Sequence, residues 1–156
     1  MIRAKASAQS AAVTILNAID QYHTDYDFFP APTSAVKGHD IETDSTAEEG
    51  LILILKGMDI TANSRKTDYL GDIKDAKTLE GANRLDGLVR DADAISLVDP
   101  RGQPYLIRLD GDGDGYVEDP SNPGTMLHKT AIVWSAGKDG DPATWGDNIK
   151  SWDTAR

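Results

Sequence analysis

Five carboxylates lie within ten positions of the segment LDGDGDGYVEDP, residues 109–120, and no basic residue accompanies them. They belong to Asp110, Asp112, Asp114, Glu118 and Asp119. Neighbouring carboxylates repel one another, and the alternating glycines give the backbone no stiffness of its own. The segment is therefore either a solvated acidic turn or a loop that a cation completes.

The start of this segment matches the calcium-loop pattern D-x-D-x-D-G. Asp110, Asp112 and Asp114 take the three acidic positions, and Gly115 supplies the turn that follows them. Tyr116 comes next and would offer its backbone carbonyl oxygen as a further ligand. Oxygen atoms at this spacing curl around a hard cation such as calcium at about 2.3–2.6 Å.

The end of the same segment departs from the pattern. Ser121 stands where a calcium loop of this kind has a bidentate glutamate, and Pro120 together with flanking strands excludes a helix–loop–helix. Glu118 or Asp119 would then have to replace the missing ligand. Two interpretations stay open: a calcium site, and an acidic turn held by hydrogen bonds from its own backbone.

A second oxygen-rich stretch follows, SAGKDGDPATWGDNIKSW, residues 135–152. Its candidate ligands are the side chains of Asp139, Asp141, Asp147 and Asn148. Glycines in the stretch allow backbone carbonyls to turn inward. Spacing alone does not separate a cation-binding loop from an ordinary C-terminal loop pinned by its tryptophans.

Catalysis has little support in the sequence. The absence of cysteine excludes thiol catalysis, disulfides and zinc–thiolate sites. His23, His39 and His128 lie far apart in the chain and adjoin no obvious nucleophile. Paired acids could serve a glycosidase, but a glycine-rich loop is a poor rigid frame for them. We expect that the protein is not an enzyme.

Size and charge narrow the choice of partners. The chain has 156 residues, which suits a single domain, and its net charge is −10. Such a surface repels phosphate backbones and anionic bilayers, and it attracts hard cations. We expect no nucleic-acid partner.

Two helices are predicted in the first third of the chain. Residues 4–27 contain no Gly or Pro, and their apolar positions recur every three or four residues, so they predict a long helix that Pro30 and Pro32 end. Ser45 and Glu48 form a capping box before the run LILIL, which predicts a second helix over 46–56. That run is far shorter than the ~20 apolar residues of a membrane helix.

Strands are predicted later in the chain, over 105–109, 130–135 and 149–152. The segment Asp99-Pro100-Arg101-Gly102 predicts a turn before the first of them. Residues 59–94 are expected to be mostly loop with a short strand or helical turn. Helices followed by strands indicate an α+β fold with an antiparallel sheet. Because all three tryptophans lie near the C-terminus, we expect the tightest core there.

Four segments together resemble the type IV pilin-like proteins, in particular the major pseudopilin of type II secretion systems. They are AIDQYHTDYDFFP (18–30), LVDPRGQPY (97–105), VWSAGKDG (133–140) and DNIKSW (147–152). Arg101 and Gln103 stand where the family usually has Trp and Asn. The DGDGDG loop resembles an addition found in some pilin-like members. The family's leader and the hydrophobic first half of its helix are absent, so we expect that the chain is a piece cut to the domain that follows them.

The resemblance implies a type IV pilin-like fold, a long N-terminal helix packed on a small antiparallel sheet with a calcium-binding C-terminal loop. In a single domain over 1–156, the truncated helix would span 1–29, a variable helix and loop region 30–98, and the sheet with its acidic loops 99–156. The resemblance also implies a calcium ion held by Asp139, Asp147 and the carbonyl of Ala136, with Asn148 and Asp141 as further candidates. We expect this loop to contribute more to calcium-dependent stability than the DGDGDG loop does.

The function implied is that of a structural filament subunit in a type II secretion pseudopilus or a related pilus-like filament. Its partners would be other pilin-like subunits, met through the N-terminal helix, and proteins of the secretion machinery. The native protein would be anchored in the inner membrane only by the missing segment and exposed to the periplasm or the cell exterior. The alternative is a calcium-dependent binding or adhesion module, such as a minor pilin at a filament tip.

Overall fold

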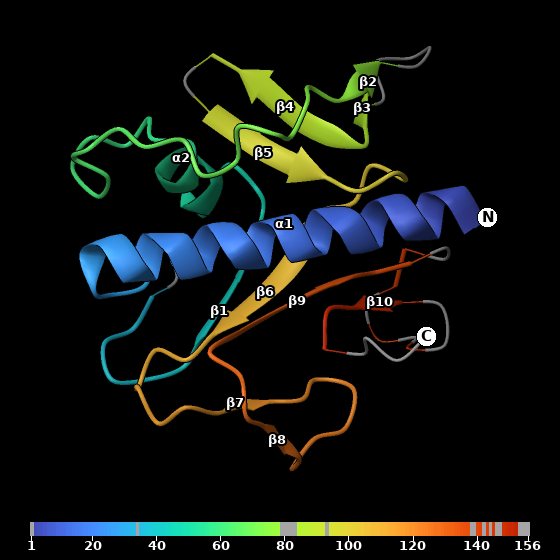
Figure 1. The fold of residues 1–156 in the computed structure, drawn as a ribbon. Helices are drawn as coiled ribbons and strands as arrows, with labels where there is room; N and C mark the ends of the chain where they lie inside the picture. Colours follow the sequence, from blue (N-terminus) through green and yellow to red (C-terminus); the bar gives the residue numbers. More distant parts are fainter. Residues whose placement is uncertain are drawn as a thin grey trace.

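One long helix lies across a small antiparallel sheet (Figure 1). The computed structural model describes residues 2–33, 35–78, 84–92, 94–137, 140–141, 143, 145 and 148–152. The helix is α1 (Ile2–Tyr26). The sheet has four strands in the order β1 (Ile41–Asp44), β6 (Tyr105–Leu109), β9 (Ala131–Ser135) and β10 (Ile149–Lys150). The predicted α+β class is confirmed, as are strands at 105–109, 130–135 and 149–152 with small shifts in their bounds.

Small and branched side chains form the stripe of α1 that meets the sheet. Its buried members are Ala8, Ala12, Ile15, Ala18, Ile19 and Tyr22. They recur every three or four positions, which keeps them on one face of the helix. No helix in the described part of the chain combines the length and the apolar character needed to cross a bilayer.

Asp27 ends α1. Its backbone is left-handed with φ of 65°, and its N–H donates to the carbonyl of His23 at 2.7 Å. Such a left-handed residue is a common helix terminus, and aspartate adopts it more readily than most residues other than glycine. The helix thus ends one residue before the predicted Asp27, ahead of Pro30 and Pro32.

A second layer covers the other side of α1 (Figure 1). It consists of the hairpin of β4 (Gly87–Asp91) with β5 (Ala94–Val98) and the short helix α2 (Leu51–Leu55). A two-stranded ladder of β2 (Lys77–Thr78) with β3 (Arg84–Leu85) adjoins them. Residues 59–94 are thus richer in strands than expected. The main sheet also draws β1 from the region 30–98, so it is not confined to 99–156.

The second helix is shorter than predicted because the Ser45 side chain does not cap it but bonds to two strands. The helix begins after Gly50, whose φ is 76°, and the capping box with Glu48 is wrong. The Ser45 hydroxyl instead donates to the carbonyl of Leu97 at 2.5 Å and accepts the N–H of Tyr105 at 2.8 Å. Ser45 is fully buried, so one hydroxyl ties the end of β1 to both β5 and β6.

Two hydrophobic clusters form the interior. The larger one joins the buried stripe of α1 to α2, to the β4–β5 hairpin and to the inward side chains of the sheet. The smaller one surrounds Val117, Ile132 and Trp134 on the opposite face of the sheet, with Trp145 and Trp152 packed against it and only partly buried. The expectation of the tightest core at the tryptophans is wrong, because small side chains on α1 let the helix approach the sheet closely.

Replacing Ser45 by alanine is expected to lower the free energy of unfolding by about 1–3 kcal/mol, because a buried carbonyl and a buried N–H lose their partner. Urea denaturation of the Ser45→Ala variant measures the change. The exposed Ser64 offers a matched control, and Ser64→Ala should leave the midpoint nearly unchanged. Equal midpoints for the two variants would show that the buried hydroxyl does not contribute.

Candidate metal centre

The acidic loop begins directly after β6 and is pressed against the segment that precedes β1. Asp110 donates its N–H to the carbonyl of Thr130 at 2.9 Å, which fixes the start of the loop beside β9. A Cβ atom at Gly111 would collide with the carbonyl oxygen of His39. Only glycine therefore allows this close approach, which brings Asp40 to the loop.

The pairing of β1 with β6 explains why Asp40 arrives there. The two strands are antiparallel, and Ile41 lies opposite Leu109. Asp40 precedes the first of these residues and Asp110 follows the second, so the register places the two aspartates at the same end of the pair. The strand ladder thus adds a fourth carboxylate to three that are local in sequence.

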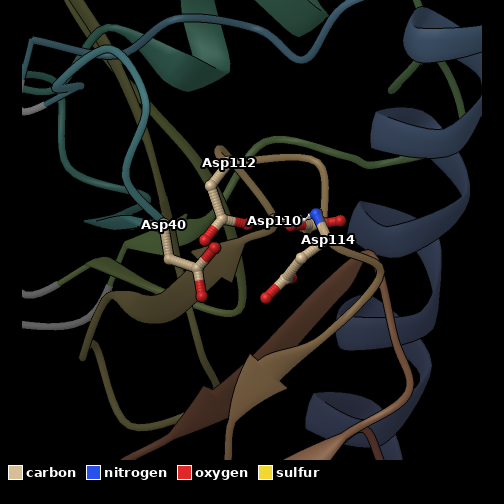
Figure 2. Close-up of side chains that lie close together, drawn as sticks. All are labelled: Asp40, Asp110, Asp112 and Asp114. Atoms are coloured by element: carbon tan, nitrogen blue, oxygen red, sulfur yellow. Dashed lines mark hydrogen bonds between the residues drawn. The ribbon is translucent and has the colours of Figure 1, made fainter.

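Four carboxylates converge at this point (Figure 2). One oxygen atom from each of Asp40, Asp110, Asp112 and Asp114 lies within 4.8 Å of the others. Figure 2 shows the side chains of Asp40, Asp112 and Asp114 turned toward one another. Carboxylate oxygens are the ligands preferred by hard divalent cations, so this group could hold a metal ion.

Hydrogen bonds from the loop's own backbone shape the group. Asp110 is 4% exposed and accepts the N–H of Asp114 at 3.1 Å and of Gly115 at 2.7 Å on its two oxygens. Asp112 accepts the N–H of Asp114 at 3.2 Å, and Asp114 accepts that of Tyr116 at 2.9 Å. These hydrogen bonds do not prevent the carboxylates from binding a cation, since each carboxylate oxygen has further lone pairs. The loop is therefore compatible with both interpretations, the hydrogen-bonded acidic turn and the cation site.

The carboxyl of Asp40 lies in a strongly perturbing environment. Burial raises the pKa of its carboxyl from the ordinary 3.8 to about 6, and the charges of Asp112 and Asp110 add to the rise. Its Oδ1 atom is buried and has no hydrogen-bond partner among the described residues. A proton or a bound cation would neutralise the charge of this carboxylate and give its Oδ1 atom a partner.

The pKa values of the Asp110 and Asp112 carboxyls are shifted in opposite directions. Burial raises the pKa of Asp110, although the Gly115 N–H opposes the rise. The pKa of Asp112 is lowered, chiefly by its side-chain hydrogen bond with Asp110. As pH falls, Asp110 and Asp40 therefore take up protons before Asp112, which stays ionised longest.

Glu118, one of the predicted ligands, is placed differently. The Glu118 carboxylate accepts the N–H of Gly124 at 2.9 Å and lies 3.9 Å from the Arg108 guanidinium. Arg108 also donates to Glu42 and, at 2.7 Å, to the backbone carbonyl of Glu118. The Tyr116 ring stacks on His128, with centroids 4.9 Å apart. The Glu118 side chain does not belong to the convergent group. The backbone carbonyl of Tyr116, which was predicted as a further ligand, stays a prediction.

Asp119, the other candidate for the missing ligand, is occupied locally. It is 8% exposed, and its Oδ1 accepts both the N–H and the hydroxyl of Ser121, at 2.8 Å and 2.6 Å. Asp40 takes the place that the sequence analysis gave to Glu118 or Asp119. The only sequence signal for Asp40 is an acid next to a strand, and residues 33–45 carry no clear strand pattern.

The C-terminal loop is described only in part. Asp139 and Asp147 lie outside the described residues, so the calcium site expected there stays a prediction. Ala136 and Asn148 are 4% and 7% exposed, and the pairing of Ile149 with Ser135 brings the two ends of the loop together. Asp141 accepts the N–H of Ala143 at 2.9 Å.

Comparison of the chain with protein families, with curated proteins and with solved structures finds no match. The fold and the site define the protein only as a class. It is an α+β domain with a helix laid on an antiparallel sheet and four convergent aspartates that could hold a metal ion.

In the presence of a chelator, the Asp40→Asn variant is expected to gain in melting temperature over the unmodified chain as pH rises from about 4 to about 6. The folded pKa of Asp40, about 6, exceeds its ordinary 3.8, so the folded state binds more protons and loses stability as pH rises through this window. Asparagine removes that loss. Calorimetric melts of both chains across this range provide the measurement, and parallel curves would contradict the assignment.

Proposed function

We propose that this chain is a structural subunit of a type II secretion pseudopilus or a related type IV pilus-like filament, and that calcium stabilises it. The observation that carries the proposal is the position of α1, which lies across the antiparallel sheet with one stripe of side chains buried and another exposed. Such a helix can pack on its own sheet through the buried stripe and contact neighbouring subunits through the exposed one.

The segments that resemble the pilin-like family occupy structural positions that support the proposal. The first contains the last residues of α1, VWSAGKDG begins within β9, and DNIKSW contains β10. In LVDPRGQPY, the Asp99 carboxylate accepts the N–H groups of Arg101 and Gln103 at 2.8 Å and 2.9 Å. These contacts use backbone atoms, so they tolerate the two departures from the family pattern.

The exposed face of α1 is suited to contact with other helices. It carries short or polar side chains, among them Ser10, Val13 and Asn17, and Val13 is 42% exposed. In the proposed filament this face meets neighbouring subunits, and an apolar segment upstream of α1 anchors the native protein in the inner membrane. The domain itself then lies in the periplasm or outside the cell, where secretion machinery proteins can reach it.

Calcium is the cation that best suits the four aspartates. It accepts six to eight oxygen ligands in a flexible arrangement, whereas magnesium demands a tight octahedron. The group contributes carboxylates from two separate segments, and the glycines of the loop let backbone carbonyls or water complete the shell. A bound ion would neutralise charges that otherwise repel one another across the contact between Asp40 and the loop.

Calcium at about a hundredfold excess over Kd is expected to raise the melting temperature by roughly 5–10 °C, because binding to the folded state alone contributes about 2.7 kcal/mol. Asp40→Asn and Asp114→Asn should each weaken calcium binding at the four-aspartate group. Asp72→Asn, at an exposed aspartate outside the group, is the matched control. Calorimetric titration with calcium and thermal melts provide the two measurements.

The same titration separates the two acidic loops. The variants Asp139→Ala and Asp147→Ala report on the C-terminal loop, whose larger share of the stabilisation stays a prediction. Unchanged calcium binding in both Asp40→Asn and Asp114→Asn would show that the four-aspartate group is not the site. Identical melts with calcium and with chelator would remove calcium from the proposal altogether.

The filament role is tested on α1 of the full-length protein in its native host. Val13→Arg places a charge on the exposed face of the helix and is expected to abolish incorporation into filaments. Val36→Arg makes the same change at a 59% exposed valine outside α1 and should leave incorporation intact. Immunogold electron microscopy of sheared filaments gives the readout. Normal filaments from Val13→Arg would favour the alternative role as an adhesion module.

A further inference from the structure

We infer that, among the Asp–Gly pairs in the described part of the chain, Asp112–Gly113 is the one that converts spontaneously to isoaspartate through a cyclic succinimide in the folded protein. The inference concerns a covalent modification and does not depend on the proposed function. It arises from a comparison of the Asp–Gly pairs, which occur at residues 86, 110, 112, 114 and 139. Glycine offers no side chain to hinder ring closure, so all five are chemically competent.

The reaction needs a free main-chain nitrogen and a mobile carboxyl. The carboxyl of the aspartate must be protonated for this step. The nitrogen of the glycine attacks Cγ and gives up its proton, the Cγ–OH bond breaks, and the hydroxyl leaves with a proton as one water molecule. Water then adds to either carbonyl carbon of the five-membered ring. Addition at the main-chain carbonyl leaves the chain running through Cγ, which is isoaspartate. One water is released and one consumed, and nothing is oxidised or reduced.

In three Asp–Gly pairs in the described part of the chain, hydrogen bonds or close packing oppose ring closure. The Gly111 N–H donates to the carbonyl of Leu109 at 2.9 Å, and Asp110 is buried with both oxygens engaged. The Gly115 N–H after Asp114 donates to the Asp110 carboxylate at 2.7 Å, which opposes loss of its proton.

The Asp86–Gly87 pair is restrained by packing. Both oxygens of Asp86 accept the hydroxyl of Ser7 on α1, at 3.1 Å and 3.2 Å. Gly87 belongs to β4, lies opposite Val98 and is close-packed against the carbonyl of Lys74. Ring closure at this pair would have to break the hairpin ladder.

The Asp112–Gly113 pair is unrestrained at the attacking nitrogen, although the Asp112 carboxyl is itself hydrogen-bonded to Asp110 and to the Asp114 N–H. Both residues are exposed, and no hydrogen bond from the Gly113 N–H is found within the described residues. A Cβ atom at Gly113 would meet nothing within 4 Å. The hydrogen bond from the Asp114 N–H to Oδ1 of Asp112, at 3.2 Å, closes a turn that contains Gly113.

Aged protein shows whether the fold selects this pair. The folded chain is incubated with chelator at mildly acidic pH, where a fraction of the aspartates is protonated. It is then digested after Lys and Arg, and its isoaspartate is located by electron-transfer fragmentation. We expect isoaspartate at Asp112 to accumulate about tenfold faster than at Asp110, Asp114 or Asp86, because freeing one hydrogen-bonded N–H takes on the order of one kcal/mol or more. Asp86 is read separately in the peptide of residues 85–90.

The chain unfolded in guanidinium is the control for intrinsic reactivity. There all Asp–Gly pairs should react at comparable rates, so a preference seen only in the folded chain comes from structure. Asp112→Glu should remove the dominant product from the folded chain, since a six-membered imide forms far more slowly. Equal rates at the four positions in the folded chain, or faster reaction at Asp110, would overturn the inference.

Discussion

Burial of one face of α1 is the interaction on which the rest of this structure depends. The stripe from Ala8 to Tyr22 packs on the sheet, while α2 and the β4–β5 hairpin lie over the helix from the other side. Fully burying one large aliphatic or aromatic side chain contributes about 1.5–3 kcal/mol, so the members of the stripe together outweigh any single polar contact. Because three alanines keep the helix close to the sheet, both layers share one core.

That packing fixes the sheet, and the sheet in turn determines the acidic site. Alternation along β6 sends Tyr105, Ile107 and Leu109 toward α1, so the strand cannot slip by one residue without exposing them. The register with β1 is then set, and Asp40 must lie beside Asp110. A group of like charges is thus held together by hydrophobic packing some distance away.

On the face of the sheet that is turned away from α1, a positive side chain is paired with carboxylates. Arg108 is partly sheltered there between Glu42 and Glu118, and its guanidinium lies 5.8 Å from the ring centroid of Trp134. The guanidinium is thus paired with two glutamates. In the described part of the chain, no lysine or arginine forms an ion pair with any of the four aspartates, so a bound cation could supply their counter-charge.

Local patterns in the sequence were enough for α1, for β6 and β9, and for the closeness of Asp110, Asp112 and Asp114. Each depends on residues a few positions apart, where helical period, strand alternation or turn chemistry acts directly. The failures involve partners far along the chain. Ser45 was predicted as a helix cap, but its hydroxyl is hydrogen-bonded to β5 and β6. The tryptophans were predicted to form the main core, but the larger core lies on the other face of the sheet, under α1. Asp40 became part of the site only through the pairing of β1 with β6, because strand register is decided by the hydrophobic core and not by the residues next to the acid.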